Sequence, residues 1–188
     1  MTKLATKKGN PMKKTISIIL IAVFAALLGA STYFIVRHNK EADKQAELYS
    51  NLASVVEAAA QTGSETETEL AELFGQNGDL VGWISIADTN INYPVMQSVN
   101  EPNFYLKHGF DKEYSEYGCP YVQEDCDVLK PSDNLVIYGH HMKNGSMFAH
   151  LDKFKSESFW SKHKTIAFNT LTDRQKYEIV AVFRTEIG

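Results

Sequence analysis

The longest apolar run of the chain lies near its N-terminus, over residues 16–36 (ISIILIAVFAALLGASTYFIV). This run contains no charged side chain. An α-helix rises about 1.5 Å per residue, so about 20 apolar residues cross the roughly 30 Å hydrocarbon core of a bilayer. The pattern therefore predicts a single transmembrane helix over residues 16–36.

A second helical pattern follows, in which apolar residues recur at spacings of three and four. Residues 40–60 are rich in helix formers. The apolar stripe consists of Leu48, Leu52, Val55, Val56 and Ala59. Such a stripe predicts a helix that either packs on the following domain or spaces it from a membrane. Residues 61–69 (QTGSETETE) are typical of a linker, and a short helix is expected over Glu69–Phe74, ended by Gly75.

The remaining residues carry mostly strand patterns, separated by turn signals. The expected strands are Leu80–Ile86, Ile91–Met96, Gly118–Gln123, Asn134–Tyr138, Thr165–Thr170 and Lys176–Phe183. Pro94 cannot donate to a ladder, which places its strand at an edge or a bulge, and the Asn134–Tyr138 run is of the buried type. A helix is expected over Ser146–Phe154, with Ser146 as its cap. Many short strands with few helical insertions predict a mainly-β barrel or sandwich.

The charge distribution adds an orientation to this picture. The chain of 188 residues has 19 Lys+Arg against 23 Asp+Glu, and its net charge of −4 argues against a nucleic-acid partner. Residues 1–36 hold five Lys and no acidic residue, so the rest of the chain carries −9. Positive charge is retained on the cytoplasmic side. We therefore expect a single-pass protein of the cell membrane, with a cytoplasmic N-terminus and an extracellular C-terminal domain.

A cleaved signal peptide is the alternative interpretation of the same run. Met12 followed by Lys13 and Lys14 resembles a second start site with a basic leader. The apolar run is longer than the roughly 7–15 residues of a signal peptide, and Leu28 fits a cleavage site poorly, so the anchor is favoured. Four segments are expected: a basic cytoplasmic head (1–15), a transmembrane anchor (16–36), a helical stalk and linker (37–69), and a β domain (70–188).

The densest group of chemically versatile residues is Tyr138–Gly145 (YGHHMKNG), directly after an expected strand. His140 follows Gly139, which lets the backbone turn, and a histidine at the end of a rigid strand suits proton transfer. A structural or solvated histidine is the other interpretation. A metal site would draw on His108, His140, His141 and His150. Their spacing lacks the H-x-x-x-H pattern and a carboxylate partner, so no metal is expected.

Two cysteines are present, Cys119 and Cys126, seven positions apart. They could form a disulfide, remain as two free thiols, or provide a nucleophile for His140. Asp125 and Asp127 flank Cys126, and neighbouring carboxylates raise rather than lower the pKa of a thiol. A structural role is therefore favoured over a catalytic one.

Taken in order, the segments of residues 70–188 resemble class B sortases, the membrane-anchored cysteine transpeptidases of Gram-positive bacteria. The resemblance rests on DLVGWISIADTNINYPVMQ (79–97), NFYLKHGFD (103–111), GCPYVQEDCD (118–127), NLVIYGHHMKNGSMFAHL (134–151), KTIAFNT (164–170) and YEIVAVF (177–183). It implies a mainly-β fold, a sortase-like eight-stranded β-barrel with extra N-terminal helices.

The reaction that this resemblance implies is a two-step transpeptidation without a cofactor. A thiolate attacks the Thr carbonyl of a C-terminal sorting signal on a surface protein and forms a thioacyl enzyme. An amine of a cell-wall precursor or a pilin then resolves this intermediate. His140 matches the family's catalytic histidine, which shuttles protons between the leaving and entering amines. Tyr138 and Leu106 match positions in the wall of the substrate groove.

The chain departs from the family pattern at its C-terminal end. The family's nucleophilic cysteine and catalytic arginine follow the strand matched by residues 177–183, and neither motif occurs before Gly188. Arg184 does not take the role of the arginine. We therefore expect a barrel that is truncated at its C-terminal end and a chain that is inactive by itself. The alternative is a non-catalytic, extracytoplasmic module of sortase-like fold that binds a peptide or a partner enzyme.

Overall fold

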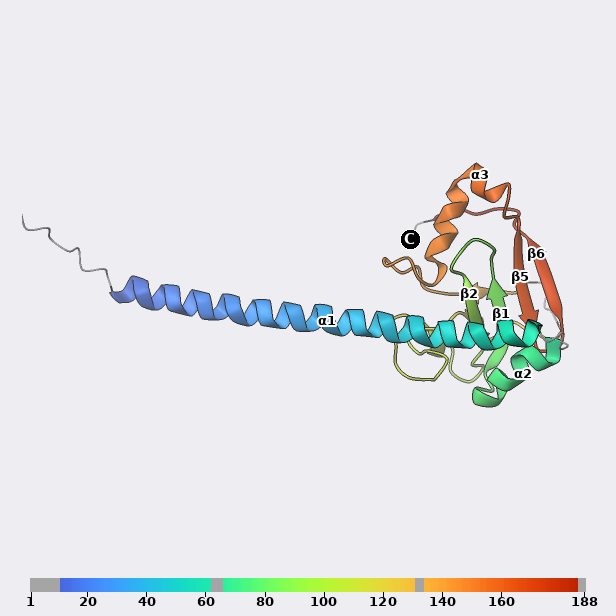
Figure 1. Ribbon diagram of the computed structural model, residues 1–188, viewed down its shortest axis with the longest axis horizontal. Coiled ribbons are helices and arrows are strands. Elements are labelled where there is room, and N and C mark those ends of the chain that lie inside the picture. Colours follow the sequence, from blue (N-terminus) through green and yellow to red (C-terminus); the bar gives the residue numbers. More distant parts are fainter. Residues whose placement is uncertain (1–10, 62–65, 131–133, 186–188) are drawn as a thin grey trace, which may run out of the picture. The chain divides into compact units, whose positions relative to one another are not determined.

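The computed structural model describes residues 11–61, 66–130 and 134–185. The chain divides into two compact units, Met1–Asp43 and Lys44–Gly188. Helix α1 (Pro11–Gln61) begins in the first unit and ends in the second (Figure 1).

The described part of the first unit is helical throughout, and the apolar residues of its run are exposed. Over the described residues, one helix is long and apolar enough to cross a membrane, and it contains the predicted anchor. A signal sequence near the N-terminus can meet the same criterion of helix length and hydropathy.

The second unit begins with the C-terminal part of α1, which packs on the domain. Its buried side chains are Gln45, Tyr49, Leu52 and Val56. Because these residues are four, three and four positions apart, they form one face of the helix. Leu52 and Val56 belong to the stripe expected from the sequence, so of the two roles considered for the stalk, packing on the domain is the one observed.

Helix α2 (Thr66–Gln76) follows and buries Leu70 and Leu73. The sequence predicted a linker over residues 61–69 and a helix end at Gly75. Both boundaries are wrong, because residues 66–69 are helical and Gly75 lies inside the helix. The burial of two leucines on one face outweighs the low helix propensity of a single glycine.

The described part of the domain is built on one curled sheet of six strands. The strands are β1 (Leu80–Ser85), β2 (Asn92–Met96), β3 (Tyr121–Val122), β4 (Ile137–Tyr138), β5 (Thr165–Thr170) and β6 (Arg174–Glu178). Their order is β4-β3-β2-β1-β5-β6. Neighbours are antiparallel, except that β2 and β3 are parallel and pair only between Met96 and Tyr121. Pro94 thus lies outside the β2–β3 ladder, where its missing N–H costs no bond to β3.

The inner face of the sheet is apolar and open. It lines a cavity of about 350 Å³ whose walls include Ile84 of β1, Ile137 of β4, Phe168 of β5 and Tyr177 of β6. Side chains of both edge strands therefore face one cavity, which makes the sheet a half-barrel. The prediction that Asn134–Tyr138 is a buried strand is wrong, because residues 135–137 are only half-buried and Tyr138 is exposed.

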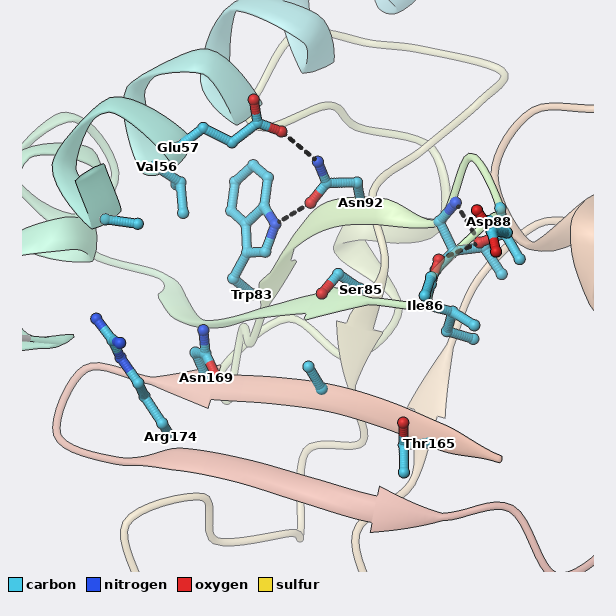
Figure 2. A pocket seen from close by; sticks show the side chains of 15 residues that line it. Val56, Glu57, Trp83, Ser85, Ile86, Asp88, Asn92, Thr165, Asn169 and Arg174 are labelled. Carbon is cyan, nitrogen blue, oxygen red and sulfur yellow. Dashed lines mark hydrogen bonds between the residues drawn. The ribbon is translucent and has the colours of Figure 1, made fainter. Parts of the chain in front are cut away.

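The outer face is polar and is covered in part by the end of α1. An open groove of about 520 Å³ lies between this helix end, β1 and β5. In Figure 2, the Trp83 indole donates to the Asn92 side chain at 2.6 Å, and Asn92 in turn donates to Glu57 of α1 at 3.4 Å. Asn169 and Arg174 lie across the groove from Glu57.

Outside the sheet, residues 77–185 as far as they are described also form the short helices η1 (Phe104–Leu106), η2 (Phe148–Lys155) and α3 (Glu157–Trp160). The helix predicted over Ser146–Phe154 is a 3-10 helix that starts two residues later. Ser146 does not cap it, because its hydroxyl instead donates to Asn144. Met147 and Phe154 are buried, as the apolar face of the expected helix required.

Strand β6 ends at Glu178, whereas the sequence predicted a strand over Lys176–Phe183. Its partner β5 begins at Thr165, which pairs with Glu178, and the last hydrogen bond along this edge runs from Ile179 N–H to the Lys164 carbonyl. A strand needs a partner for its backbone groups, and none is present among the described residues beyond that point. The Phe183 side chain is accordingly 83% exposed.

Candidate active site around His140

His140 lies just beyond the end of β4, and its backbone is fixed by the start of η2. The Phe148 N–H donates to the His140 carbonyl at 2.9 Å. The Phe148 ring packs over Gly139, where an added Cβ would lie 2.6 Å from two ring carbons. A glycine is needed before the histidine because of this close approach rather than because of its backbone angles.

The imidazole of His140 is held by a different part of the chain. Its Nε2 lies 2.7 Å from the backbone carbonyl oxygen of Leu106, at the end of η1. The ring is half-buried. A residue 34 positions earlier therefore fixes the orientation of the side chain that the sequence singled out for proton transfer.

The loop that supplies this carbonyl, Asn103–Gly118, is closed by backbone hydrogen bonds. The Ser115 N–H donates to the Lys107 carbonyl at 2.8 Å, and the Cys119 N–H donates to the Tyr105 carbonyl at 2.9 Å. Asn103 and Gly118 have positive φ angles of 63° and 58°. These two left-handed residues mark the ends of the loop, where the chain reverses.

A buried tyrosine anchors the base of the same loop. The Tyr105 hydroxyl donates to Asp79 at 2.7 Å and accepts from the Asn77 amide at 3.0 Å. Burial, followed by the hydrogen bond to Asp79, raises the pKa of Tyr105 above its usual range. Burial opposes the ionisation of Asp79, but hydrogen bonds from Lys112 and Tyr105 outweigh it and lower the pKa of that carboxyl.

Residues 139–147 between β4 and η2, the His140 loop, are joined to the Asn103–Gly118 loop by a second contact. The Asn144 amide donates to the Tyr117 hydroxyl at 3.1 Å. On the far side, the Met147 N–H donates to the Tyr93 hydroxyl at 3.1 Å, which ties the His140 loop to β2. The histidine is thus held between two loops and one strand.

Tyr138, two residues before His140, and Leu106, whose carbonyl contacts the imidazole, both have exposed apolar surface. Their side chains are 42% and 38% exposed. The Tyr138 hydroxyl donates to Gln123 at 2.8 Å, and its ring centre is 5.4 Å from that of Tyr121. Leu106 supplies the carbonyl that contacts the imidazole. Leu106 thus contacts His140 through its backbone carbonyl, whereas the Tyr138 side chain contacts Gln123 and Tyr121. That both residues line a substrate groove stays a prediction.

Glu116 is a charged neighbour of this site that the sequence did not reveal. It pairs with Lys107 at 2.7 Å and accepts a hydrogen bond from Tyr114. These contacts, the Lys107 bond first, lower the pKa of Glu116, and the charge of His140 acts in the same direction. Only the folding of the Asn103–Gly118 loop brings this carboxylate within electrostatic reach of His140, so sequence spacing gave no signal.

The two cysteines are free thiols and neither is hydrogen-bonded to His140. Cys119 is buried, its thiol points to the Pro94 carbonyl at 3.6 Å, and burial raises its pKa far above the usual range. Cys126 is half-buried and its thiol lies 3.4 Å from the Asn134 carbonyl. Since β3 and β4 are antiparallel, Cys126 lies at the opposite end of this pair from His140.

The four histidines considered for a metal site have separate surroundings. Two rings contact backbone carbonyls, His140 that of Leu106 and His108 that of Phe104. His141 pairs with Asp152 at 3.1 Å, and His150 accepts from the Asn90 N–H at 2.9 Å. Within residues 11–61, 66–130 and 134–185, no three His, Cys, Asp or Glu side chains are grouped as metal ligands would be.

Comparison with known proteins identifies the family. A model of the sortase domain matches residues 84–187. Sortase B of Listeria monocytogenes is 35% identical over 128 residues, 68% of this chain and 52% of that protein. Sortase B of Staphylococcus aureus is 30% identical over 109 residues, 58% of this chain and 44% of that protein. The chain thus spans about half the length of the curated relatives it matches.

The structure agrees with the sequence comparison. A Staphylococcus aureus sortase B–substrate complex superposes with a TM-score of 0.69 at 26% identity, covering 74% of this chain and 64% of that one. The curled half-barrel is thus the sortase B fold, as the resemblance of the motifs implied. The chain belongs to the sortase family, and the proteins that it resembles make it a class B member.

Proposed function

We propose that this protein serves the transpeptidation of class B sortases. In this reaction a C-terminal sorting signal is cleaved after Thr through a thioacyl intermediate, and the surface protein is joined to an amine of a cell-wall precursor or a pilin. The observation that carries the proposal is His140, fixed by the Leu106 carbonyl at the rim of an exposed apolar surface in a chain of the sortase family. No cofactor takes part in the proposed chemistry.

In this proposal His140 is the catalytic acid and base. It protonates the leaving amine during acylation and takes a proton from the entering amine during resolution. The exposed side chains of Tyr138 and Leu106 bind the sorting signal next to it. Both are large and apolar, and each adjoins His140 along the backbone or through the Leu106 hydrogen bond.

We also propose that the 188-residue chain has no transpeptidase activity by itself. The reaction needs a thiolate beside the histidine. Cys119 is buried with a raised pKa, and Cys126 lies at the other end of the β3–β4 pair. That the family's cysteine and arginine motifs lie beyond residue 188 stays a prediction, which the DNA that follows codon 188 would test.

The proposed location is the cell membrane, with the N-terminus in the cytoplasm and the domain outside. Support comes from the apolar helix over residues 16–36 and from the five Lys that precede it. Charge retained on the cytoplasmic side sets this orientation. The domain then faces the surface proteins and amine acceptors that the proposed reaction joins.

A fluorogenic peptide of the Asn-Pro-x-Thr type tests the catalytic half of this proposal. Incubated with the full chain and a reductant, it should show no thiol-dependent cleavage. His141→Ala is the matched control for His140→Ala, because the two histidines are adjacent and the His141 side chain pairs with Asp152 on an exposed surface. Cleavage that His140→Ala abolishes and His141→Ala preserves would overturn the proposed inactivity.

A non-catalytic peptide-binding module is the second candidate function, favoured by the absence of a placed thiol. Fluorescence anisotropy with the same peptide measures binding without turnover. Both candidates predict weaker binding for Tyr138→Ala and Leu106→Ala. They differ in the DNA beyond codon 188, since a continuing frame with cysteine and arginine motifs supports the enzyme and a genuine stop supports the module.

A further inference from the structure

We infer that Gly118 and the Leu106 carbonyl are positioning elements that set the tautomer of His140. They hold the neutral imidazole with its proton on Nε2, which leaves Nδ1 as the nitrogen that exchanges protons with the reacting groups. This inference deepens the proposed function, because it assigns the working nitrogen of the histidine proposed there.

The first step is the hydrogen bond itself. The Nε2 atom of His140 lies 2.7 Å from the Leu106 carbonyl oxygen. A carbonyl oxygen can only accept, so Nε2 must carry the donated hydrogen. In a neutral imidazole the other nitrogen then has no proton and is a base. In the imidazolium both nitrogens donate, so the contact with Leu106 persists while Nδ1 gains and loses its proton.

The Leu106 carbonyl can lie at this position because residue 118 is a glycine. Gly118 has a φ of 58°, and a Cβ added there would lie 2.5 Å from the Tyr105 carbonyl oxygen and 2.6 Å from that of Leu106. Real Cβ atoms do not approach oxygen so closely, so any side chain at position 118 must displace the Leu106 carbonyl. Only glycine at position 118 allows the two ends of this loop to come so close together.

Gly118 is itself prevented from moving away. Its carbonyl accepts a hydrogen bond of 2.5 Å from the Tyr49 hydroxyl of α1, and its N–H donates to the Ser115 carbonyl at 3.2 Å. The following N–H, of Cys119, is bonded to the Tyr105 carbonyl. A substitution at position 118 is therefore relieved by a shift of the Leu106 peptide rather than of Gly118.

The backbone contacts of His140 do not fix the orientation of its ring. Its backbone is set by the bond from Phe148 N–H, but this bond leaves the side-chain torsions free. Among the hydrogen bonds of the described residues, the ring makes one, to Leu106. Loss of that contact should free both the orientation of the ring and its choice of tautomer.

Nitrogen NMR of the full chain, labelled at its histidines and held in detergent micelles, tests the inference. The signals of His140 are identified by their absence in His140→Gln. At a pH where the ring is neutral, a protonated Nε2, an unprotonated Nδ1 and a slowly exchanging Nε2 proton are expected. Gly118→Ala should accelerate the exchange of that proton roughly tenfold, as loss of one hydrogen bond implies.

Gly145→Ala is the matched control. Gly145 also has a positive φ, 87°, and lies in the His140 loop, but an added Cβ would meet no atom within 4 Å. It should leave the tautomer and the proton exchange unchanged. A proton on Nδ1 in the unmodified protein overturns the inference, as does unchanged exchange in Gly118→Ala. If Gly118→Ala does not fold, the unmodified protein alone decides.

The tautomer is read without turnover. A negative peptide assay therefore leaves this inference intact, and a wrong tautomer leaves the proposed reaction intact. The two failures are thus distinguishable.

Discussion

His140 and the two cysteines lie on the same β3–β4 pair and its flanks, yet their surroundings differ in kind. The histidine has its backbone bonded to Phe148 and its ring bonded to Leu106, with exposed apolar surface beside it. Cys119 is sealed in the interior, and Cys126 lies at the opposite end of the pair. The fold thus fixes the ring of the histidine that we propose for proton transfer, while both thiols contact other backbone carbonyls.

The burial and the hydrogen-bond partners of a reactive side chain thus depend on the loops around it and not on its residue type. Cys119 is only two residues from β3, but burial raises its pKa and removes it from solvent. His140 is two residues from β4, and the closed Asn103–Gly118 loop supplies its partner. Preorganisation of this kind is what distinguishes a catalytic histidine from a solvated one.

The largest expected effect concerns the reactivity of the two thiols. A pulse of iodoacetamide followed by mass spectrometry should show Cys126 alkylated on the order of 10³-fold faster than Cys119, because Cys119 reacts only after local opening. Addition of denaturant is the control and should bring the two rates together. Similar rates in the folded protein would contradict the difference drawn here between the cysteines.

The next effect compares two glycines by their cost to stability. Gly118→Ala should lower the free energy of unfolding by about 2–4 kcal/mol, from a left-handed backbone plus the overlap with two carbonyl oxygens. Gly145→Ala should lower it by only about 1–2 kcal/mol, because it meets no atoms. Urea unfolding followed by the fluorescence of Trp83 and Trp160 measures both. Equal losses would show that the contact with Leu106 is not tight.

A smaller effect should follow from the base of the Asn103–Gly118 loop. Tyr105→Phe removes the bond to Asp79 and should cost about 1.5–3 kcal/mol. The folded pKa of Asp79 is lowered, so its contribution is present above its unfolded pKa of about 3.9 and is lost as the pH falls through the folded value. The free energy of unfolding of Tyr105→Phe should therefore fall less on acidification than that of the unmodified protein. Urea unfolding at a series of acidic pH values measures this dependence. The same pH dependence in both proteins would refute the claim that the Tyr105 hydrogen bond lowers the pKa of Asp79.

The smallest expected effect concerns the His163–Asp88 pair, which contacts neither His140 nor the cysteines. His163 donates to Asp88 at 2.6 Å, and this bond, helped by the Phe159 carbonyl, raises the pKa of His163. Its contribution to stability is present below the unfolded pKa of about 6.5 and is lost as the pH rises through the folded value. Asp88→Asn should lower the pKa of His163 in a proton NMR titration. An unchanged titration would mean that the pair does not form.

Much of the sheet could be predicted from the sequence, because its strands follow local patterns. Strand β5 has the predicted bounds, Thr165–Thr170, and β1 differs from its prediction only at Ile86. Strand β6 was predicted too far toward the C-terminus, because the apolar residues 180–183 have strand propensity but no partner strand in the described part of the chain. Strand length depends on pairing, which a local pattern does not contain.

The candidate site divides in the same way. His140 could be recognised from its motif and its place after a strand. The Leu106 carbonyl could not, because every residue has a carbonyl and only the fold selects this one. The requirement for glycine at position 118 could not be predicted either, because it arises from the close approach of the Tyr105 and Leu106 carbonyl oxygens in the folded chain. Glu116 is brought to the site by the same closure.

The most direct test of the central claim is whether His140 and either thiol sense one another. The proton NMR titration of His140 would be recorded with both thiols free and again after they are blocked as methyl disulfides in mild denaturant and the protein is refolded. The account predicts superimposable titration curves of His140 before and after the thiols are blocked. A shift of the His140 titration curve when the thiols are blocked would contradict the account, because it would show a coupled thiol–imidazole pair. Loss of that shift in Cys126→Ser or in Cys119→Ser would identify the cysteine responsible.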